Sequence, residues 1–159
     1  MTAWVKSELQ ICHQWTEKAL ADLKENDWTK SPQGFRSNVN WQVGHMIISG
    51  YFHSVLCING SDAEIKAQFD PKEYASWYGM GSDPKLDLDK KPGMSLLLAN
   101  LNLLDKRGIE IVSSMDEKDL ESPTILKNPM AVSKKEALLW HVKHRMWHVG
   151  QVSMIKSHL

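Results

Sequence analysis

The sequence predicts an all-α protein, a four-helix bundle formed by a single domain that spans residues 1–159. Four long segments repeat apolar residues at the 3.6-residue period of an amphipathic helix. No segment shows sustained alternation of apolar and polar residues flanked by hairpin turns, the pattern of a half-buried strand. A chain of 159 residues buries about 68–70% of its unfolded surface, which is enough for one core of packed helices.

The first two predicted helices cover residues 4–23 and 39–58. The apolar stripe of the first consists of Val5, Leu9, Cys12, Ala19 and Leu23. Ser37 or Asn38 is the expected N-cap of the second helix, because a short polar side chain accepts hydrogen bonds from the free amides of the first turn. Asn59-Gly60 should end this helix, since glycine readily takes the left-handed conformation that follows a last helical turn.

The third predicted helix begins near Met94, directly after Pro92-Gly93. Its apolar stripe consists of Leu97, Leu101, Leu104, Gly108, Ile111 and Met115. The fourth helix opens with a capping box, in which Ser133 and Glu136 satisfy each other's backbone amides. Its inward stripe is predicted to consist of Ala137, Trp140, His144, His148, Gln151 and Ile155.

The connector between the second and third helices, residues 59–91, is long for a compact bundle. If these two helices run parallel, the chain must return along the whole bundle, which is roughly 30 Å for a 20-residue helix. Asp70 is placed to cap a short helix on the way. Apolar anchors for the connector are expected at Trp77, Tyr78 and Met80. Two interpretations remain open, a packed crossover and a lid over a pocket.

Composition excludes several classes of protein. With 19 basic and 19 acidic residues the formal net charge is zero, so no basic excess favours a nucleic-acid partner. No signal peptide is evident at the start, and no apolar run is long enough to span a membrane. Cys12 and Cys57 are too few for a disulfide framework and are expected as buried thiols. These observations predict a cytoplasmic protein.

Three of the seven histidines suggest a metal site. His144 and His148 are four residues apart, so they lie one above the other on the same face of a helix. His45 should point inward from the second helix. A buried imidazole needs a partner for each ring nitrogen, and one divalent cation would serve all three rings.

Zinc or nickel suits neutral imidazole, and three protein ligands leave one coordination position open, as in catalytic sites. Whether His53 or His141 joins the site stays open at this stage. So does the structural interpretation, in which the histidines only hold the helices together.

Two sequence motifs resemble those of a known family. Residues 38–45 read Asn-Val-Asn-Trp-Gln-Val-Gly-His, and residues 144–151 read His-Arg-Met-Trp-His-Val-Gly-Gln. Their order and separation resemble the DinB-like (DinB/YfiT) family of metal-binding four-helix bundles, over essentially the whole chain. The resemblance implies that His45, His144 and His148 bind a metal. It also implies an up-down-down-up bundle and a homodimer.

The resemblance further implies that Gly44 and Gly150 allow close helix approach and that Gln151 supports the site through a hydrogen bond. Characterised relatives include S-transferases and isomerases that use a low-molecular-weight thiol. The sequence therefore suggests a metal-dependent enzyme, of thiol-dependent S-transferase or hydrolase type, acting on a small molecule. Trp41, Trp77, Tyr78 and Trp147 would line its pocket. The alternative is a non-catalytic metal-containing binding or stress-response module.

Overall fold

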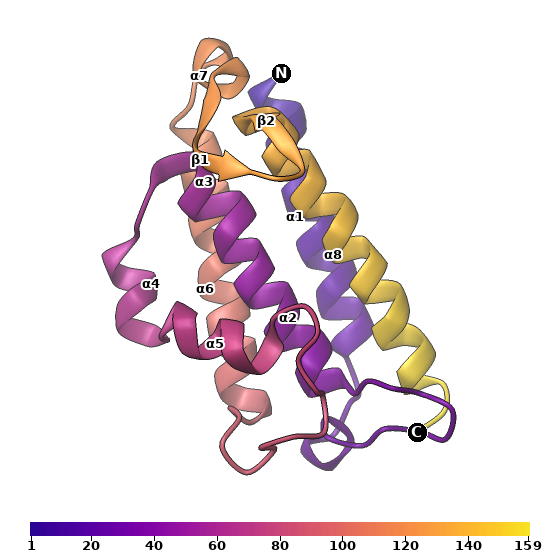
Figure 1. Ribbon diagram of the computed structural model, residues 1–159. Coiled ribbons are helices and arrows are strands. Elements are labelled where there is room, and N and C mark those ends of the chain that lie inside the picture. Colours follow the sequence, from indigo (N-terminus) through magenta and orange to yellow (C-terminus); the bar gives the residue numbers. More distant parts are fainter.

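The computed structural model describes residues 1–159 and is mostly helical (Figure 1). Its four long helices are α1 (Thr2–Leu20), α2 (Val39–Gly50), α6 (Met94–Ser113) and α8 (Lys134–Lys156). Both α6 and α8 pack against α1 and against α2. In Figure 1, α1 and α8 run in one direction along the molecule, and α2 and α6 run in the opposite direction.

The apolar faces of these helices meet in one core of 29 buried residues. Val5, Leu9 and Cys12 of the first predicted stripe are buried there, and Leu97, Leu101 and Leu104 of the third are buried with them. Cys12 and Cys57 are free, buried thiols, as the sequence predicted. None of the helices combines the length and the apolar character that crossing a membrane requires.

The ends of the helices follow from local chemistry. Asn38 is the N-cap of α2, and its side-chain oxygen accepts from the amide of Trp41 at 2.8 Å. Ser133 and Glu136 form the predicted capping box of α8. The first helix ends at Leu20, three residues before the predicted end, because Ala21 is extended and Asp22 adopts a left-handed φ of 67°. Leu23 therefore lies beyond the helix, although it still packs on the core.

The second predicted helix is continuous but not uniform. After α2 the chain forms a π-helical segment, Tyr51–Leu56, and then a last turn, α3 (Cys57–Asn59). Gly60 follows with a φ of 86°, which explains the helix stop. A π-helical turn inserts one extra residue and changes the direction of the side chains beyond it. Nothing in the apolar period of the sequence indicated this segment, and it contains His53.

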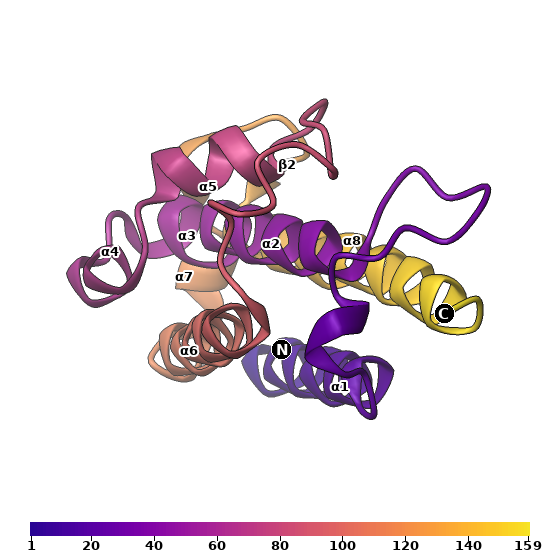
Figure 2. The same ribbon diagram turned by 90° about the horizontal axis from the view of Figure 1, so that it is seen from below.

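The long connector is folded against α2, with its second short helix packed on α2 and its first in contact with α6 (Figure 2). It contains α4 (Ala63–Gln68) and α5 (Pro71–Tyr78), and Asp70 caps α5 as predicted. Tyr78 is fully buried, so this part of the connector is packed into the core. The prediction that Met80 anchors the connector is wrong, since 96% of its surface is exposed. The turn after α5 carries Met80 outward.

The structure adds a small element that the sequence did not predict. After α7 (Glu117–Glu121), strands β1 (Pro123–Asn128) and β2 (Ala131–Ser133) form an antiparallel hairpin before α8. Ile125, Leu126 and Val132 are exposed. The hairpin therefore buries no complete face, and a strand of this kind leaves no alternating pattern in the sequence.

The two motif glycines differ in their surroundings. A Cβ on Gly44 would lie 2.3 Å from Cδ1 of Tyr78, so only glycine lets the ring of Tyr78 pack against α2. The close approach is between α2 and α5 rather than between two long helices. At Gly150 no atom lies within 4 Å of an added Cβ. The expectation of close packing at Gly150 is wrong, because this residue faces an open cavity.

Candidate metal centre

His45, His144 and His148 converge at the contact between α2 and α8. One ring nitrogen from each can be chosen so that all three lie within 4.8 Å of one another. The ring of His45 lies 4.7 Å from that of His148 and 5.2 Å from that of His144, measured between centroids. The sequence predicted this trio from spacing and motif alone, and the fold brings it together.

His45 is held from two sides. Its Nδ1 donates to the backbone carbonyl of Tyr78 at 2.7 Å, so the proton of the neutral ring is on Nδ1. Its ring stacks on Trp41 with centroids 4.9 Å apart and planes inclined by 7°. The indole nitrogen of Trp41 in turn donates to Ser82 at 2.8 Å. The connector thus fixes His45 and leaves its Nε2 without a protein partner.

His148 is oriented by a buried glutamine that sequence analysis did not single out. Its Nδ1 lies 2.6 Å from Oε1 of Gln42. The amide nitrogen of Gln42 donates to Ser37 at 2.9 Å and to Gln151 at 2.8 Å, so the glutamine oxygen faces the histidine. Gln151 therefore supports His148 only through Gln42. The position of Gln42, three residues before His45 on the same helix, was the available signal.

His144 differs because its partner can donate or accept. Nδ1 lies 3.0 Å from the hydroxyl of Ser49, and Nε2 lies 3.1 Å from Nε2 of His148. Since Gln42 holds the proton of His148 on Nδ1, the contact between the two Nε2 atoms is a hydrogen bond only if His144 carries its proton on Nε2. Turning the hydroxyl of Ser49 would reverse that tautomer and free both Nε2 lone pairs for a cation.

The electrostatics of the site keep the three rings neutral. Burial lowers the pKa of His45 below its usual value, although the hydrogen bond to Tyr78 opposes this. Burial and the neighbouring His45 lower the pKa of His144 to about 4. Burial, with His45 and His144 nearby, lowers the pKa of His148 to about 3. Neutral imidazole is the form that binds a metal.

A cavity of about 430 Å³ opens onto the three histidines. Besides them it is lined by Trp41, Ser49, His53, Met80, Gly81, Met130, Trp140, Trp147 and Gln151. No carboxylate, lysine or arginine contributes to the wall. Of the predicted pocket residues, Trp41, Trp147 and Gln151 line it, whereas Trp77 does not and Tyr78 contributes its carbonyl oxygen to His45.

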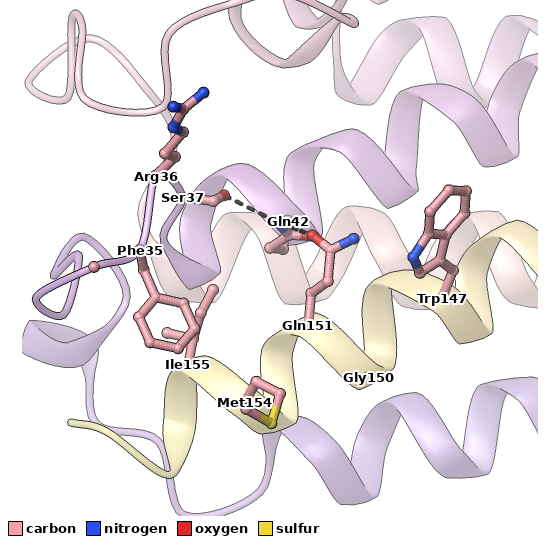
Figure 3. Close-up of a pocket in the computed structure, with 10 residues that line it drawn as sticks. Phe35, Arg36, Ser37, Gln42, Trp147, Gly150, Gln151, Met154 and Ile155 are labelled. Atoms are coloured by element: carbon pink, nitrogen blue, oxygen red, sulfur yellow. Dashed lines mark hydrogen bonds between the residues drawn. The ribbon is translucent and has the colours of Figure 1, made fainter.

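A larger cavity of about 610 Å³ lies beside this one, between residues 34–37 and α8 (Figure 3). It contains no histidine, so this larger hollow is not the candidate metal centre. The two cavities share Trp147 and Gln151, and Gln151 is hydrogen-bonded to Gln42 in the wall of the larger one (Figure 3). Gly150 faces this larger hollow.

The two other buried histidines lie outside the trio. His141 packs beside Gly50, where an added Cβ would come within 3.0 Å of its Cε1. Seven residues separate it from His148, which is about 10 Å along a helix. His53 lines the cavity, but its Nδ1 faces the amide nitrogen of Asn128 at 2.9 Å. Neither belongs to the group of converging nitrogens.

Comparison with known protein families assigns the chain to one of them. Residues 8–152 match the family model described as the DinB superfamily. The chain belongs to the DinB superfamily. The match includes both histidine motifs and all four long helices except the first residues of α1 and the last residues of α8. Among curated proteins, no sequence matches this chain.

A solved structure supports the fold of this DinB-superfamily chain. It is similar to a structure described as the conserved protein of locus from Enterococcus faecalis, with a TM-score of 0.68 and 18% sequence identity. The likeness covers 98% of this chain and 94% of the other. At this level of identity it establishes the shared fold and carries no information about function.

Replacing Gln42 with leucine should weaken metal binding without removing a ligand. The variant takes away the acceptor for the Nδ1 proton of His148, and loss of such a supporting group costs about 10–100-fold in metal affinity. Competition with a chromophoric chelator measures the change. Gln151→Ala is the control, because Gln151 is hydrogen-bonded to Gln42 and to no histidine. Equal affinities for the Gln42 variant and the parent would contradict this account.

Acid should remove the stability that the metal contributes. The folded protein holds these histidines neutral, with a pKa of about 4 at His144 and about 3 at His148, whereas an unfolded histidine protonates near 6.5. The contribution of these histidines to the free energy of unfolding is therefore complete above about pH 6.5. It is lost as the pH falls toward 3, because the unfolded chain binds protons that the folded protein does not. Protons also compete with the cation for the ring nitrogens.

Melting temperatures at pH 8 and pH 5, each with zinc and with chelator, measure this effect. His53 and His141 also have depressed pKa values and His13 a raised one, so the slope of the metal-free protein reflects all of them. The difference in melting temperature between the zinc and chelator samples isolates the contribution of the metal. An equal zinc-dependent rise in melting temperature at both pH values would exclude histidine ligation.

Proposed function

We propose that this protein is a metal-dependent enzyme whose divalent cation is bound by His45, His144 and His148. The observation that carries the proposal is the orientation of the rings. A neighbouring group contacts Nδ1 of each ring, and the three Nε2 atoms face one place at the wall of an open cavity. The Nε2 atoms of His144 and His148 lie 3.1 Å from each other, and Nε2 of His45 has no partner within the protein, whereas a purely structural role would favour a partner for it as well.

The donor set fits zinc or nickel, since both bind neutral imidazole well. Three protein ligands without a nearby carboxylate leave at least one coordination position toward the cavity. A cation held there would supply Lewis acidity and lower the pKa of a thiol or a water. Family membership supports an up-down-down-up bundle as the scaffold, in agreement with the opposite directions of the helix pairs.

The reaction we propose is of thiol-dependent S-transferase or hydrolase type, on a small-molecule substrate. The cavity of about 430 Å³ is of a size for a small ligand. Trp41 keeps its ring against His45 and shapes one wall, while Trp140 and Trp147 offer apolar surface to the rest of a substrate. The free thiols Cys12 and Cys57 are consistent with a cytoplasmic protein.

Elemental analysis of the purified protein is the first test, followed by a screen for thiol transfer and hydrolysis. We expect about one equivalent of zinc or nickel per chain. Less than a tenth of an equivalent after metal supplementation would refute the proposal. A full equivalent with no exchangeable position, judged from the spectrum of the cobalt-substituted protein with and without added thiol, would instead favour the non-catalytic binding or stress-response module.

We also expect a homodimer. The chain carries seven tryptophans, and Trp4, Trp15 and Trp147 are each at least half exposed. Exposed aromatic side chains are enriched at protein interfaces, and two-fold dimers are the commonest oligomers. Light scattering at micromolar concentration should give twice the chain mass of 18.1 kDa. A monomer mass at that concentration would remove this expectation.

A further inference from the structure

His53, which lines the cavity without joining the metal trio, has a defined tautomer. Asn128, at the end of β1, accepts from the backbone amide of Met130 at 2.9 Å through Oδ1. This contact fixes the orientation of the side-chain amide, so Nδ2 faces Nδ1 of His53 at 2.9 Å. An amide nitrogen only donates, and Nδ1 of His53 must therefore be the acceptor.

A neutral His53 then carries its proton on Nε2. Burial, with His144 and His45 nearby, lowers its pKa to about 4, which keeps the ring neutral at pH 7. Nε2 has no hydrogen-bond partner in the protein. The side-chain atoms that are both unpartnered and fully buried are Trp28 Nε1, Ser31 Oγ and Tyr51 OH, so Nε2 of His53 is not fully buried. The remaining donor of His53 is therefore accessible from the cavity.

This proton placement is opposite to that of His45 and His148, whose Nδ1 atoms donate and whose Nε2 atoms carry no proton. His53 consequently offers an N–H group where those two rings offer lone pairs. It lies eight residues beyond His45, about 12 Å along the helix axis. The cavity thus has a metal-binding end and a hydrogen-bond-donating end, with Ser49 and Trp140 among the residues of its wall.

We propose that His53 forms the second subsite of the cavity and donates a hydrogen bond to an oxygen of the ligand. The ligand class is an elongated small molecule with an anionic oxygen at each end, such as a short dicarboxylate. One end lies at the cation and the other at Nε2 of His53. Three neutral imidazoles leave the charge of a divalent cation uncompensated, and no acidic side chain lines the cavity. An anion is therefore the ligand that the electrostatics favour.

The tautomer is tested without metal. Long-range ¹H–¹⁵N correlation spectra of the metal-free protein assign the protonated nitrogen of each histidine. We expect His53 protonated on Nε2, and His45 and His148 on Nδ1. A proton on Nδ1 of His53 would overturn the proposal. This result does not depend on metal binding, whereas failure to bind metal would refute the proposed function on which the ligand-binding part rests.

Two variants of His53 distinguish the role of Nε2 from that of Nδ1. The amide nitrogen of glutamine reaches about as far as Nε2, and that of asparagine about as far as Nδ1, so His53→Gln retains a donor in the cavity and His53→Asn does not. Zinc-loaded proteins are titrated with acetate and with glutarate in a calorimeter. Zinc content and melting temperature of each variant are measured first, which shows that both fold and bind the cation.

The parent protein should bind glutarate about tenfold more tightly than acetate, since a hydrogen bond to a charged group contributes at least that much. His53→Asn should bind the two equally, and His53→Gln should recover most of the difference. Acetate affinity should be the same in all three proteins. Equal binding of acetate and glutarate by the parent, or an equal loss of both in His53→Asn, would overturn the second subsite.

Discussion

Replacing His148 with alanine should abolish stoichiometric binding of zinc or nickel and, with it, any metal-dependent activity. His148 contributes an Nε2 that lies 3.1 Å from that of His144 and faces His45 across the contact between α2 and α8. A group that only supports a ligand is worth about 10–100-fold in affinity, so loss of a ligand should exceed ~100-fold. Elemental analysis and chelator competition measure the result.

His158→Ala is the matched control, because it removes an exposed histidine just beyond the end of α8, ten residues after His148 and outside the converging trio. The metal-free His148 variant should melt below the metal-free parent, because the substitution leaves Oε1 of the buried Gln42 without its donor. If His148→Ala kept one equivalent of tightly bound zinc, His45 and His144 would need another partner and the assignment of the trio would be wrong.

The largest loss of stability should follow from breaking a buried ion pair on the opposite side of α8. Arg145 and Asp105 are both nearly inaccessible, with side-chain exposures of 2% and 7%. Nη2 of Arg145 donates to Oδ2 of Asp105 at 2.7 Å, and Nη1 bonds the other oxygen. Nε donates to Thr16 at 3.0 Å, and His13 contacts the same carboxylate at 2.8 Å. The network joins α1, α6 and α8.

Burial alone would raise the pKa of Asp105, but Arg145 and His13 outweigh burial and lower it to about 2. The carboxylate is therefore charged at neutral pH, and Asp105→Leu would leave the guanidinium of Arg145 buried without a counter-charge. Removing one partner of a buried pair costs about 3–5 kcal/mol. Urea denaturation, read from the midpoint at constant slope, measures the change in the free energy of unfolding.

Two further proteins make this test specific. Asp105→Leu combined with Arg145→Met should recover most of the loss, because replacing both charges by apolar groups of similar size is often close to neutral. Lys90→Ala removes the solvent-exposed ion pair between Lys90 and Asp87 and should leave the urea midpoint almost unchanged. If Asp105→Leu were as harmless as Lys90→Ala, the ion pair would not stabilise the fold.

The sequence by itself determined the helices and the three candidate ligands. Apolar residues at a 3.6-residue period locate a helix wherever one face is buried, and the caps at Asn38 and Ser133 mark helix starts through chemistry within a few residues. His144 and His148 share a face because four residues make little more than one turn. The family motif then joined His45 to them. All of these signals are local, or combine two local patterns.

The tertiary structure decided what surrounds the ligands. The carbonyl of Tyr78 reaches His45 only because α5 packs against Gly44, and Gln42 meets His148 only because α2 and α8 lie side by side. The proton of His53 depends on Asn128, 75 residues away on a hairpin that has no sequence signature. These contacts come from distant parts of the chain, and periodicity carries no information about which helix faces meet. The sequence therefore named the candidate ligands, and the packing of the helices determined their tautomers and the cavity they face.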